Sequence, residues 1–276
     1  MNHITFPYLG LEFHLNETIN VFGLRIYWYA IIIATGMLTA MAIAAHEFKK
    51  KGLKGDDLAD FVLFAIPLGI LGARLYYVIF EWSYYAQNPT EILAIWKGGL
   101  AIYGGIITGV VVAIVFTRVK KISFLWFADV ATVGLFIAQS IGRWGNFVNA
   151  EAFGKETSLP WAMIVEGPNV KPYSPFGPCH PTFLYESLWN LAGFLISYFI
   201  IYRLLKKDGC VFSFYLIWYG CGRFFIEGLR MDSLWLIPNA VRVSQVVAIG
   251  CILCGIATLF YVKNRNKKEK IQNAEQ

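Results

Sequence analysis

Charge is scarce in this chain. Asp, Glu, Lys and Arg make up 15% of its 276 residues, whereas soluble globular domains carry about 25%. Hydrophobic residues make up 57%, and the mean hydropathy is +0.52. This composition argues against a soluble enzyme, a disordered chain or a nucleic-acid-binding protein. The net charge of +6 does not indicate nucleic-acid binding, because the basic residues form short clusters between long apolar runs. We expect a polytopic integral membrane protein.

Several other patterns are absent. The five cysteines have no spacing that predicts a disulfide framework or a metal site. No basic segment precedes the first apolar run, so we predict a permanent span there rather than a cleaved signal peptide. The sequence contains no metal-ligand cluster, phosphate-binding loop or serine-nucleophile motif. We therefore predict neither a cofactor nor a bound metal.

What the chain has in abundance is apolar segments of membrane-spanning length, which is about 20 residues for a helix. We predict an all-α fold with about seven transmembrane helices. Amphipathic, aromatic stretches at 1–21 and 83–98 are predicted to lie at the membrane surface. The seven predicted spans are 22–46, 58–82, 99–118, 122–147, 181–203, 209–229 and 241–262.

Basic residues predict the topology. Of the 24 Lys and Arg residues, 15 follow spans one, three, five and seven, and such clusters mark the cytoplasmic side. The N-terminus is then outside and the C-terminus cytoplasmic, as an odd number of spans requires. We predict one membrane-embedded domain over 1–276, with a small external head at 148–180 and a basic cytoplasmic tail at 263–276. Six of the ten prolines lie from Pro160 to Pro181, which favours a folded loop there.

Polar side chains within the predicted spans lie at one depth, towards the external ends. Charged groups inside a bilayer are costly and usually functional. Asp129, near the inner end of span four, is an exception to which the sequence assigns no role. The external layer consists of Tyr29, Arg74, Tyr103, Gln139, Arg143, Asn146, Glu151, His180, Glu186, Tyr219, Arg223, Glu227 and Arg230.

Helical spacing places several of these groups on shared faces. The guanidinium group offers a planar fork of donors that suits phosphate. Arginines facing one cavity therefore predict a site for an anionic lipid headgroup at the outer leaflet. The two stripes are Tyr219, Arg223, Glu227 and Arg230 in span six, and Gln139, Arg143 and Asn146 in span four.

Each group taken alone also has a simpler interpretation. Arg223 and Glu227, four residues apart, suit a structural ion pair. Arg74 suits a side chain that snorkels to the outer headgroups. Packing alone does not explain why so many polar groups lie at one depth. The other simple interpretations are a loop histidine for His180 and ordinary interfacial tyrosines for Tyr29 and Tyr103.

Glycine is frequent in and just before span three, at positions 98, 99, 104, 105 and 109. These residues would allow a neighbouring helix or a lipid to approach closely. Gly105 and Gly109, four residues apart, suit a small-xxx-small packing face. Packing is the preferred interpretation for Gly109.

Five sequence blocks carry most of these polar groups. The longest runs Gly142-Arg143-Trp144-Gly145-Asn146-Phe147-Val148-Asn149-Ala150-Glu151-Ala152-Phe153-Gly154. The other blocks are Gly72-Ala73-Arg74-Leu75-Tyr76-Tyr77, Gly98-Gly99-Leu100 with Tyr103-Gly104-Gly105, His180-Pro181-Thr182 with Leu184-Tyr185-Glu186, and Tyr219-Gly220 with Arg223-Phe224, Glu227 and Arg230. In this order the chain closely resembles the prolipoprotein diacylglyceryl transferase family of bacterial inner membranes, over essentially its whole length.

The resemblance implies an enzyme that transfers the diacylglyceryl group of phosphatidylglycerol to the lipobox cysteine of a prolipoprotein. A thioether forms and glycerol 1-phosphate is released, without a metal or nucleotide. The implied partners are phosphatidylglycerol, prolipoprotein signal peptides and membrane lipids, with no nucleic acid. The implied location is the bacterial cytoplasmic (inner) membrane.

The resemblance also implies roles for individual residues. Arg143 would hold the phosphatidylglycerol headgroup, and Arg223 would stabilise the leaving phosphate. Asn146 and Glu151 would orient the headgroup or an arginine. The other residues expected to bind phosphatidylglycerol are Tyr29, Arg74, Gly154, His180, Glu227, which would position Arg223, and Arg230.

One position departs from the family pattern. Many members have a histidine where this chain has Tyr103, and that histidine is the usual candidate for deprotonating the thiol. Tyrosine, with an ordinary pKa near 10, is a poor base at neutral pH unless cations lower it. Three alternatives stay open: a tuned Tyr103, Glu151 as the base, or Tyr103 as a positioning group.

A phospholipid or anion transporter or scramblase is the alternative function. Transporters distribute polar groups around midplane sites and often show inverted repeats. The single external layer and the absence of a visible repeat favour the transferase.

Overall fold

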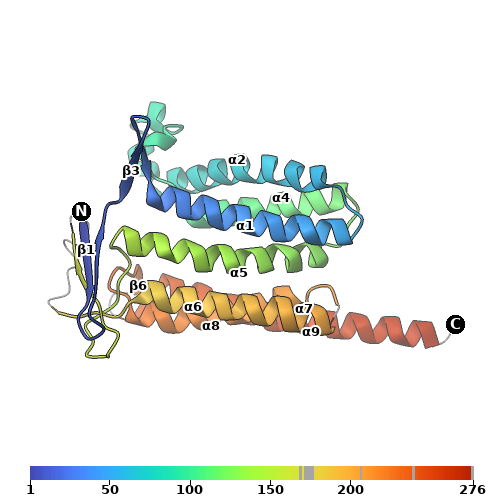
Figure 1. Cartoon of the computed structure of the whole chain (residues 1–276). Coiled ribbons are helices and arrows are strands. Elements are labelled where there is room, and N and C mark those ends of the chain that lie inside the picture. Colours follow the sequence, from blue (N-terminus) through green and yellow to red (C-terminus); the bar gives the residue numbers. More distant parts are fainter. Residues whose placement is uncertain (168–169, 171–176, 206, 238–239, 275–276) are drawn as a thin grey trace. The chain divides into compact units, whose positions relative to one another are not determined.

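The computed structural model describes residues 1–167, 170, 177–205, 207–237 and 240–274, with side chains described as far as Arg265 (Figure 1). Most of this part of the chain is helical. The helices are α1 Trp28–Lys50, α2 Gly55–Phe80, α3 Trp82–Tyr85, η1 Pro89–Glu91, η2 Ile95–Lys97, α4 Ile102–Val119, α5 Phe124–Val148, α6 Thr182–Leu195, η3 Ile196–Ile201, α7 Tyr202–Leu205, α8 Cys210–Leu229 and α9 Val243–Ala274. The strands are β1 Asn2–Phe6, β2 Leu11–Leu15, β3 Thr18–Val21, β4 Leu24–Tyr27, β5 Ile164–Glu166, β6 Trp235–Ile237 and β7 Val241–Arg242.

The strands correct the prediction of an all-α fold. Asn2, Ile4 and Phe6 are buried and alternate with less buried neighbours, the two-residue period of a strand. The predicted start of span one at residue 22 was also wrong, because the β3–β4 hairpin continues to Tyr27 and α1 begins at Trp28. An apolar run rich in aromatic and β-branched residues is compatible with either a helix or a strand. Here the first residues of the run form strand β4, and the helix begins after them.

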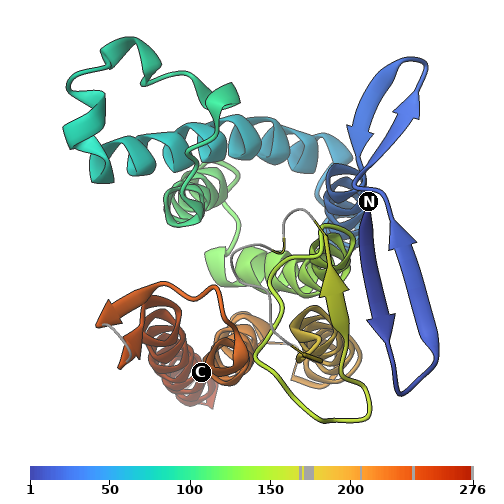
Figure 2. The same ribbon diagram turned by 90° about the vertical axis from the view of Figure 1, so that its left-hand side faces the viewer.

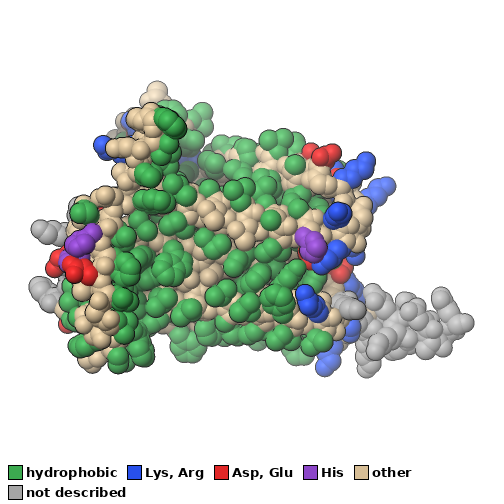
Figure 3. All heavy atoms as spheres, viewed as in Figure 1, with side chains coloured by type: hydrophobic (Ala, Val, Ile, Leu, Met, Phe, Trp, Pro, Cys, Tyr) green, Lys and Arg blue, Asp and Glu red, His purple; other side chains and the backbone are tan. Residues whose placement is uncertain are grey.

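Six helical segments are long and apolar enough to cross a membrane, as expected of a multi-pass membrane protein. The fifth of them combines α6, the π-helix η3 and α7. Hydrophobic side chains cover much of the surface in Figure 3. The 20-residue α8 is not among the six, since its polar residues reduce its hydropathy. The six segments are Trp28–Lys50, Gly55–Phe80, Ile102–Val119, Phe124–Val148, Thr182–Leu205 and Val243–Arg265.

The chain forms two compact units. The first comprises Met1–Ile43 and Ala128–Gln276, and the second Ala44–Phe127. In the first unit, small residues bring helices close together: an added Cβ at Gly36 of α1 would lie 3.1 Å from the Ala138 carbonyl oxygen of α5. The α8–α9 contact is closer still, because a Cβ at Gly220 would lie 2.6 Å from the Ala248 carbonyl oxygen. Small residues at such crossings are typical of membrane helices.

A small sheet caps the first unit. β1 pairs antiparallel with β2 on one side and with β5 on the other (Figure 2). Its inner face supplies Ile4 and Phe6 to an apolar cluster that includes Phe147 of α5 and Phe183 of α6. Of the predicted head at 148–180, Ile164–Glu166 form strand β5 of this sheet, whereas residues 168–169 and 171–176 lie outside the described residues. The side chains of the predicted basic tail beyond residue 265 lie outside them too.

The second unit centres on the pair α2 and α4. A Cβ at Gly104 of α4 would clash with the Gly72 carbonyl oxygen and the Tyr76 side chain of α2. At Gly109, by contrast, an added Cβ would meet nothing within 4 Å among the described residues. The close approach is therefore made by Gly104, and the predicted packing role of Gly109 is not seen in this unit.

The structure gives Asp129 of α5 a role that its sequence position did not suggest. Its carboxylate accepts hydrogen bonds from the backbone N–H groups of Gly209 and Phe212, both at 2.7 Å. These are among the amides that the first turn of α8 leaves without helical partners. Asp129 thus caps α8 from a neighbouring helix and compensates the positive end of the α8 dipole.

Candidate active site

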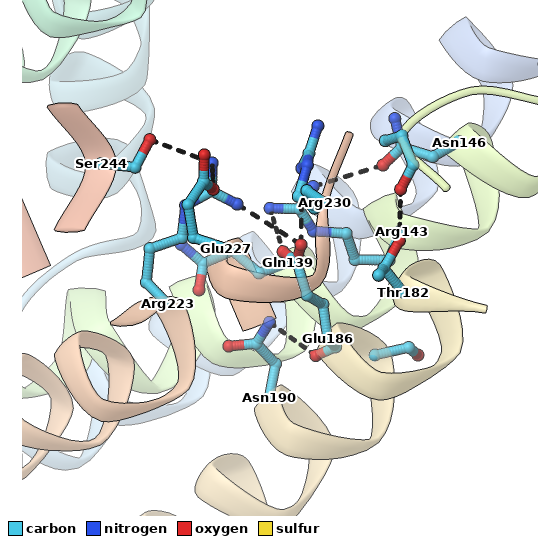
Figure 4. Close-up of polar contacts among 12 residues, drawn as sticks. Gln139, Arg143, Asn146, Thr182, Glu186, Asn190, Arg223, Glu227, Arg230 and Ser244 are labelled. Atoms are coloured by element: carbon cyan, nitrogen blue, oxygen red, sulfur yellow. Dashed lines mark hydrogen bonds and ion pairs between the residues drawn. The ribbon is translucent and has the colours of Figure 1, made fainter. Parts of the chain in front are cut away.

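Three arginines of the first unit converge on one buried carboxylate, Glu186 of α6 (Figure 4). Arg143 of α5 is paired with it at 2.5 Å. Arg223 of α8 and Arg230, directly after α8, lie 3.4 and 3.5 Å from its other oxygen. The Glu186 side chain is only 7% exposed. A charge so enclosed must be compensated, and the three guanidinium groups provide the compensation.

The arginines have further acidic partners. Arg223 pairs with Glu227 one turn later, at 2.8 Å, and lies 3.5 Å from the Ser244 hydroxyl of α9. Arg230 pairs with Asp232 through Nε and Nη2 at 2.9 and 2.7 Å. Although burial opposes its charge, the bonds to Asp232 raise the pKa of Arg230 above its ordinary value. The cluster is therefore a charge-balanced network rather than a set of isolated cations.

Arg143 is the most accessible of the three arginines. Its side chain is 25% exposed, against 19% for Arg223 and 12% for Arg230. Each guanidinium carries five N–H donors, and the described contacts of Arg143 engage its two terminal nitrogens with Glu186 and Asn146. An incoming anion would thus reach Arg143 more readily than the other two.

The end of α5 forms a second polar chain. Asn146 accepts a hydrogen bond from Arg143 at 3.3 Å and donates one to Glu151 at 2.8 Å. Glu151 lies within a tight turn, between Ala150 and Ala152, whose φ angles are 51° and 57°. Non-glycine residues are strained in this left-handed region, and such strain is concentrated at functional sites. The turn directs the Glu151 side chain back along α5, so that Arg143, Asn146 and Glu151 form one connected series.

Gly154 joins the head to the cluster. Its backbone N–H donates to the His180 carbonyl at 3.0 Å, and it forms an isolated β-bridge with Arg230. A Cβ at this position would lie 2.7 Å from the Cβ of His180. The absence of a side chain at Gly154 thus allows the segments before α6 and after α8 to lie on either side of it.

His180 directs its ring to Tyr185, with Nδ1 3.1 Å from the phenol oxygen. Burial lowers the pKa of His180 below its ordinary value, which favours a neutral ring at neutral pH.

Tyr29 of α1 packs its ring against Gly145 of α5, where an added Cβ would lie 2.7 Å away. Gln139, one turn before Arg143, donates to the Tyr215 hydroxyl at 2.9 Å.

Reciprocal polar contacts hold the three helices that supply the cluster. Ser140 of α5 and Ser187 of α6 each donate to the other's backbone carbonyl at 2.9 Å. The indole N–H groups of Trp189 in α6 and Trp218 in α8 do the same, also at 2.9 Å. Such bonds are favourable in an apolar surrounding. They fix α5, α6 and α8 next to one another at the level of Glu186.

Arg74 and Tyr103 belong to the second unit and are described within it. Arg74 is 2% exposed and donates to the backbone carbonyls of Glu91, Ile92, Gly98 and Gly99 at 2.6 to 2.9 Å. It therefore orders the loop between α3 and α4. Tyr103 packs near Tyr76 of α2, with ring centroids 6.5 Å apart.

The sequence placed Glu186 in the external polar layer but assigned it no role. Its only sequence signal is an acidic residue in an apolar segment, since Glu186 has no basic residue at helical spacing in α6. Its three partners lie 43, 37 and 44 residues away, in other segments. The function of Glu186 as the common partner was therefore visible only in the fold.

Comparison with known proteins decides the family. The model for prolipoprotein diacylglyceryl transferase matches residues 16–261. The chain belongs to the prolipoprotein diacylglyceryl transferase family. Curated relatives named phosphatidylglycerol–prolipoprotein diacylglyceryl transferase include those of Streptococcus mutans, Streptococcus agalactiae and Clostridioides difficile. The first is 49% identical over 252 residues, covering 88% of this chain and 93% of the relative. The other two are 48% identical over 245 residues (86% and 91%) and 45% identical over 248 residues (90% and 95%).

The match confirms the resemblance found in the sequence, and this member of the transferase family is an enzyme. It covers the whole of the arginine cluster around Glu186, since Arg143, Arg223 and Arg230 all lie within residues 16–261. The roles of individual residues stay predictions.

Proposed function

We propose that this protein transfers the diacylglyceryl group of phosphatidylglycerol to the lipobox cysteine of prolipoproteins in the bacterial cytoplasmic membrane. The proposal rests on family membership and on one structural observation, the convergence of Arg143, Arg223 and Arg230 on Glu186. A phosphodiester headgroup is an oxyanion like the Glu186 carboxylate, and guanidinium groups bind both through the same fork of donors. The same guanidinium groups therefore suit a phosphate, and Arg143 is the most exposed of the three.

The chemistry assigns separate tasks to the arginines. The cysteine thiolate attacks the glycerol carbon that carries the phosphate, so that a C–S bond forms while the C–O bond to phosphate breaks. The leaving group is glycerol 1-phosphate, whose charge increases as the bond breaks. The more accessible Arg143 would hold the headgroup, and Arg223, held by Glu227, would stabilise the departing phosphate. Arg230 would contribute further positive charge next to the departing phosphate.

The thiol proton must be removed, because the thiolate is the nucleophile. Glu151 is hydrogen-bonded through Asn146 to the Arg143 series, which favours it as the group that accepts the proton or orients the headgroup. Tyr103 remains an alternative base or a positioning group. The proton would finally reside on the phosphate product, which balances the reaction.

The other predicted residues act less directly in this proposal. Gly154 and His180 would shape the external side of the lipid site, and Tyr29 would border it at α1. Arg74, whose donors are directed to loop carbonyls, would support the substrate by ordering Gly98 and Gly99. Seven spans, with α8 as the sixth, and an external N-terminus complete the proposal.

A transfer assay tests it. Purified protein in nanodiscs is mixed with labelled phosphatidylglycerol, a lipobox peptide, its Cys→Ser control and a chelator. Label on the cysteine peptide only, with glycerol phosphate released, is the expected result. Movement of lipid between leaflets without labelled peptide would instead establish the transporter alternative.

Variants assign the residues in the same assay. We expect Arg143→Ala to lower kcat at least 100-fold and Arg143→Lys to recover part of it, because lysine keeps the charge without the fork. Arg203→Ala, in α7 beside the Phe199 ring, is the matched control and should retain activity. Tyr103→His, Tyr103→Phe and Glu151→Gln separate the base assignments. A folded Arg143→Ala protein with full activity would refute the site.

A further inference from the structure

A second cluster of chemically active side chains lies on the outer face of the small sheet, away from the arginine cluster. The antiparallel register of β1 and β2 places His3 opposite His14, and Glu12 lies two residues before His14 on the same face. Across the other edge of β1, His3 is opposite Glu166 of β5. Histidine and acidic side chains are visible together at the position of β1 in Figure 3. Three strands thus bring two imidazoles and two carboxylates to one surface.

These side chains lie close enough together to share one metal ion. Glu12 Oε1 lies 2.7 Å from His3 Nε2 and 3.2 Å from His14 Nε2. One ligand atom from each residue lies within 4.8 Å of the other two. A zinc ion bonded at about 2.0–2.2 Å to nitrogen and oxygen holds tetrahedral ligands a little over 3 Å apart. The three side chains therefore need only small rotations to surround one ion.

Glu166, the fourth residue of the group, orients the His3 side chain. Glu166 Oε2 lies 3.1 Å from His3 Nδ1, so His3 Nδ1–H donates to this carboxylate and Nε2 faces Glu12. A carboxylate on the far nitrogen of a histidine ligand is the usual outer partner of zinc sites, where it fixes the tautomer. The His3 and His14 rings are stacked, with centroids 4.5 Å apart, and Nε2 of each ring lies next to Glu12 Oε1.

We propose that His3, Glu12 and His14 bind one divalent transition-metal ion such as Zn²⁺, with Glu166 orienting His3. Two imidazoles and one carboxylate suit zinc rather than calcium or magnesium, which prefer oxygen ligands. The side chains are 31%, 55% and 58% exposed, so the ion has an open path and a place for a water ligand. Sequence spacing did not suggest this group, because the pairing of β1 with β2 brings His3 next to His14 and Glu12.

The ion would connect strands rather than perform the transfer. It joins β1 to β2 directly and, through Glu166, to β5. On the opposite face of β1, Asn2 donates to the Val148 carbonyl at the end of α5, and Ile4 and Phe6 pack into the cluster with Phe147. A metal bound at this sheet would therefore stabilise the layer that covers the turn carrying Glu151.

Metal binding is measured directly, on full-length protein in detergent without a polyhistidine tag. Isothermal titration with Zn²⁺ and the visible spectrum with Co²⁺ report stoichiometry and ligand geometry. We expect one ion per chain and an increase in Tm with Zn²⁺. His14→Ala and Glu12→Gln should weaken binding at least tenfold and abolish the Tm shift. Glu166→Gln should weaken it 10- to 100-fold, as removal of an outer partner does elsewhere.

His46→Ala, at an exposed position of α1, is the matched control and should bind as the unmodified protein does. Equal Tm values for all variants without metal would establish that they fold alike, since His14 and Glu12 are exposed. The proposal is overturned if the unmodified protein binds no Zn²⁺ stoichiometrically. It is equally overturned if folded His14→Ala and Glu12→Gln proteins retain full affinity, because the ion would then lie elsewhere.

Discussion

At the residue scale, Glu186 holds together groups that would otherwise repel one another. Arg143, Arg223 and Arg230 all direct nitrogen atoms to its two oxygens. Removing the carboxylate would leave three cations close together in a poorly solvated place. Breaking a buried ionic set by removing one partner costs about 3–5 kcal/mol. Glu186 therefore serves both stability and the placement of the arginines.

We expect Glu186→Ala to lower the stability of the protein by roughly that amount and to abolish transfer. Glu186→Gln, which keeps the volume and one oxygen acceptor, should be less destabilised but still inactive, because the arginines lose their common anchor. Thermal denaturation in detergent and the transfer assay measure the two effects. Glu81→Ala, at an exposed position, is the control. Normal activity in folded Glu186→Ala protein would contradict the assignment.

Some residues of the site could be predicted from sequence and others could not. Arg143 and Arg223 are recognisable because charges in apolar segments are rare, and their depth follows from the spans. Glu186 was recognisable as a polar group, but its three partners come from segments far apart in sequence. The cap made by Asp129 and the site made by His3 and His14 depend on tertiary contacts in the same way.

At the element scale, α8 depends on a residue of another helix for its beginning. Asp129 accepts from Gly209 and Phe212 and is itself 3% exposed. We expect Asp129→Ala to destabilise the protein by about 1–3 kcal/mol, because two amides lose their acceptor in an apolar surrounding. Asp129→Asn, which keeps one oxygen acceptor, should be intermediate.

Asp56→Ala, at an exposed position in the first turn of α2, controls for loss of an acidic residue. The denaturation midpoints of Asp129→Ala, Asp129→Asn and Asp56→Ala measure how much the cap stabilises the protein. A midpoint for Asp129→Ala equal to that of Asp56→Ala would show that the cap contributes little.

The contact between α2 and α4 offers a sharper comparison, because two glycines of one helix differ in surroundings. At Gly104 an added Cβ would clash with backbone and side chain of α2, and at Gly109 it would meet open space. We expect Gly104→Ala to destabilise the protein by about 1–3 kcal/mol through overpacking. Gly109→Ala should be neutral or slightly stabilising, since alanine favours the helix. Equal effects of the two substitutions on thermal stability would contradict this packing.

The elements themselves were predictable to different degrees. Long apolar helices such as α4 and α9 are specified by composition, and both limits of α4 were placed within a few residues. The start of α9 was placed equally well, but the helix continues beyond the predicted end at residue 262 to Ala274. The hairpins before α1 were not, because their apolar residues merge with the helix that follows. The short strand β5 has three residues and depends on β1 for its pairing, so local sequence gives it little signal.

At the scale of the whole molecule, the distribution of basic residues predicts which ends of the helices face the cytoplasm. Tyr8 lies at the tip of the β1–β2 hairpin and Lys49 near the end of α1, and both are exposed. In a protein without its native cysteines, we expect Tyr8→Cys to react with a membrane-impermeant maleimide in intact cells. Lys49→Cys should react only after permeabilisation. The reverse pattern would invert the topology.

The pairing of β1 with β5 has a consequence for biosynthesis. His3 and Glu166 are 163 residues apart, so the first strand to leave the ribosome must wait for its partner. At about 5–20 residues per second, that interval is roughly 10 to 30 seconds, during which four of the apolar helices enter the membrane. The sheet is therefore assembled late. In the proposed topology, with an external N-terminus, its closure also requires that the N-terminus has already crossed the bilayer.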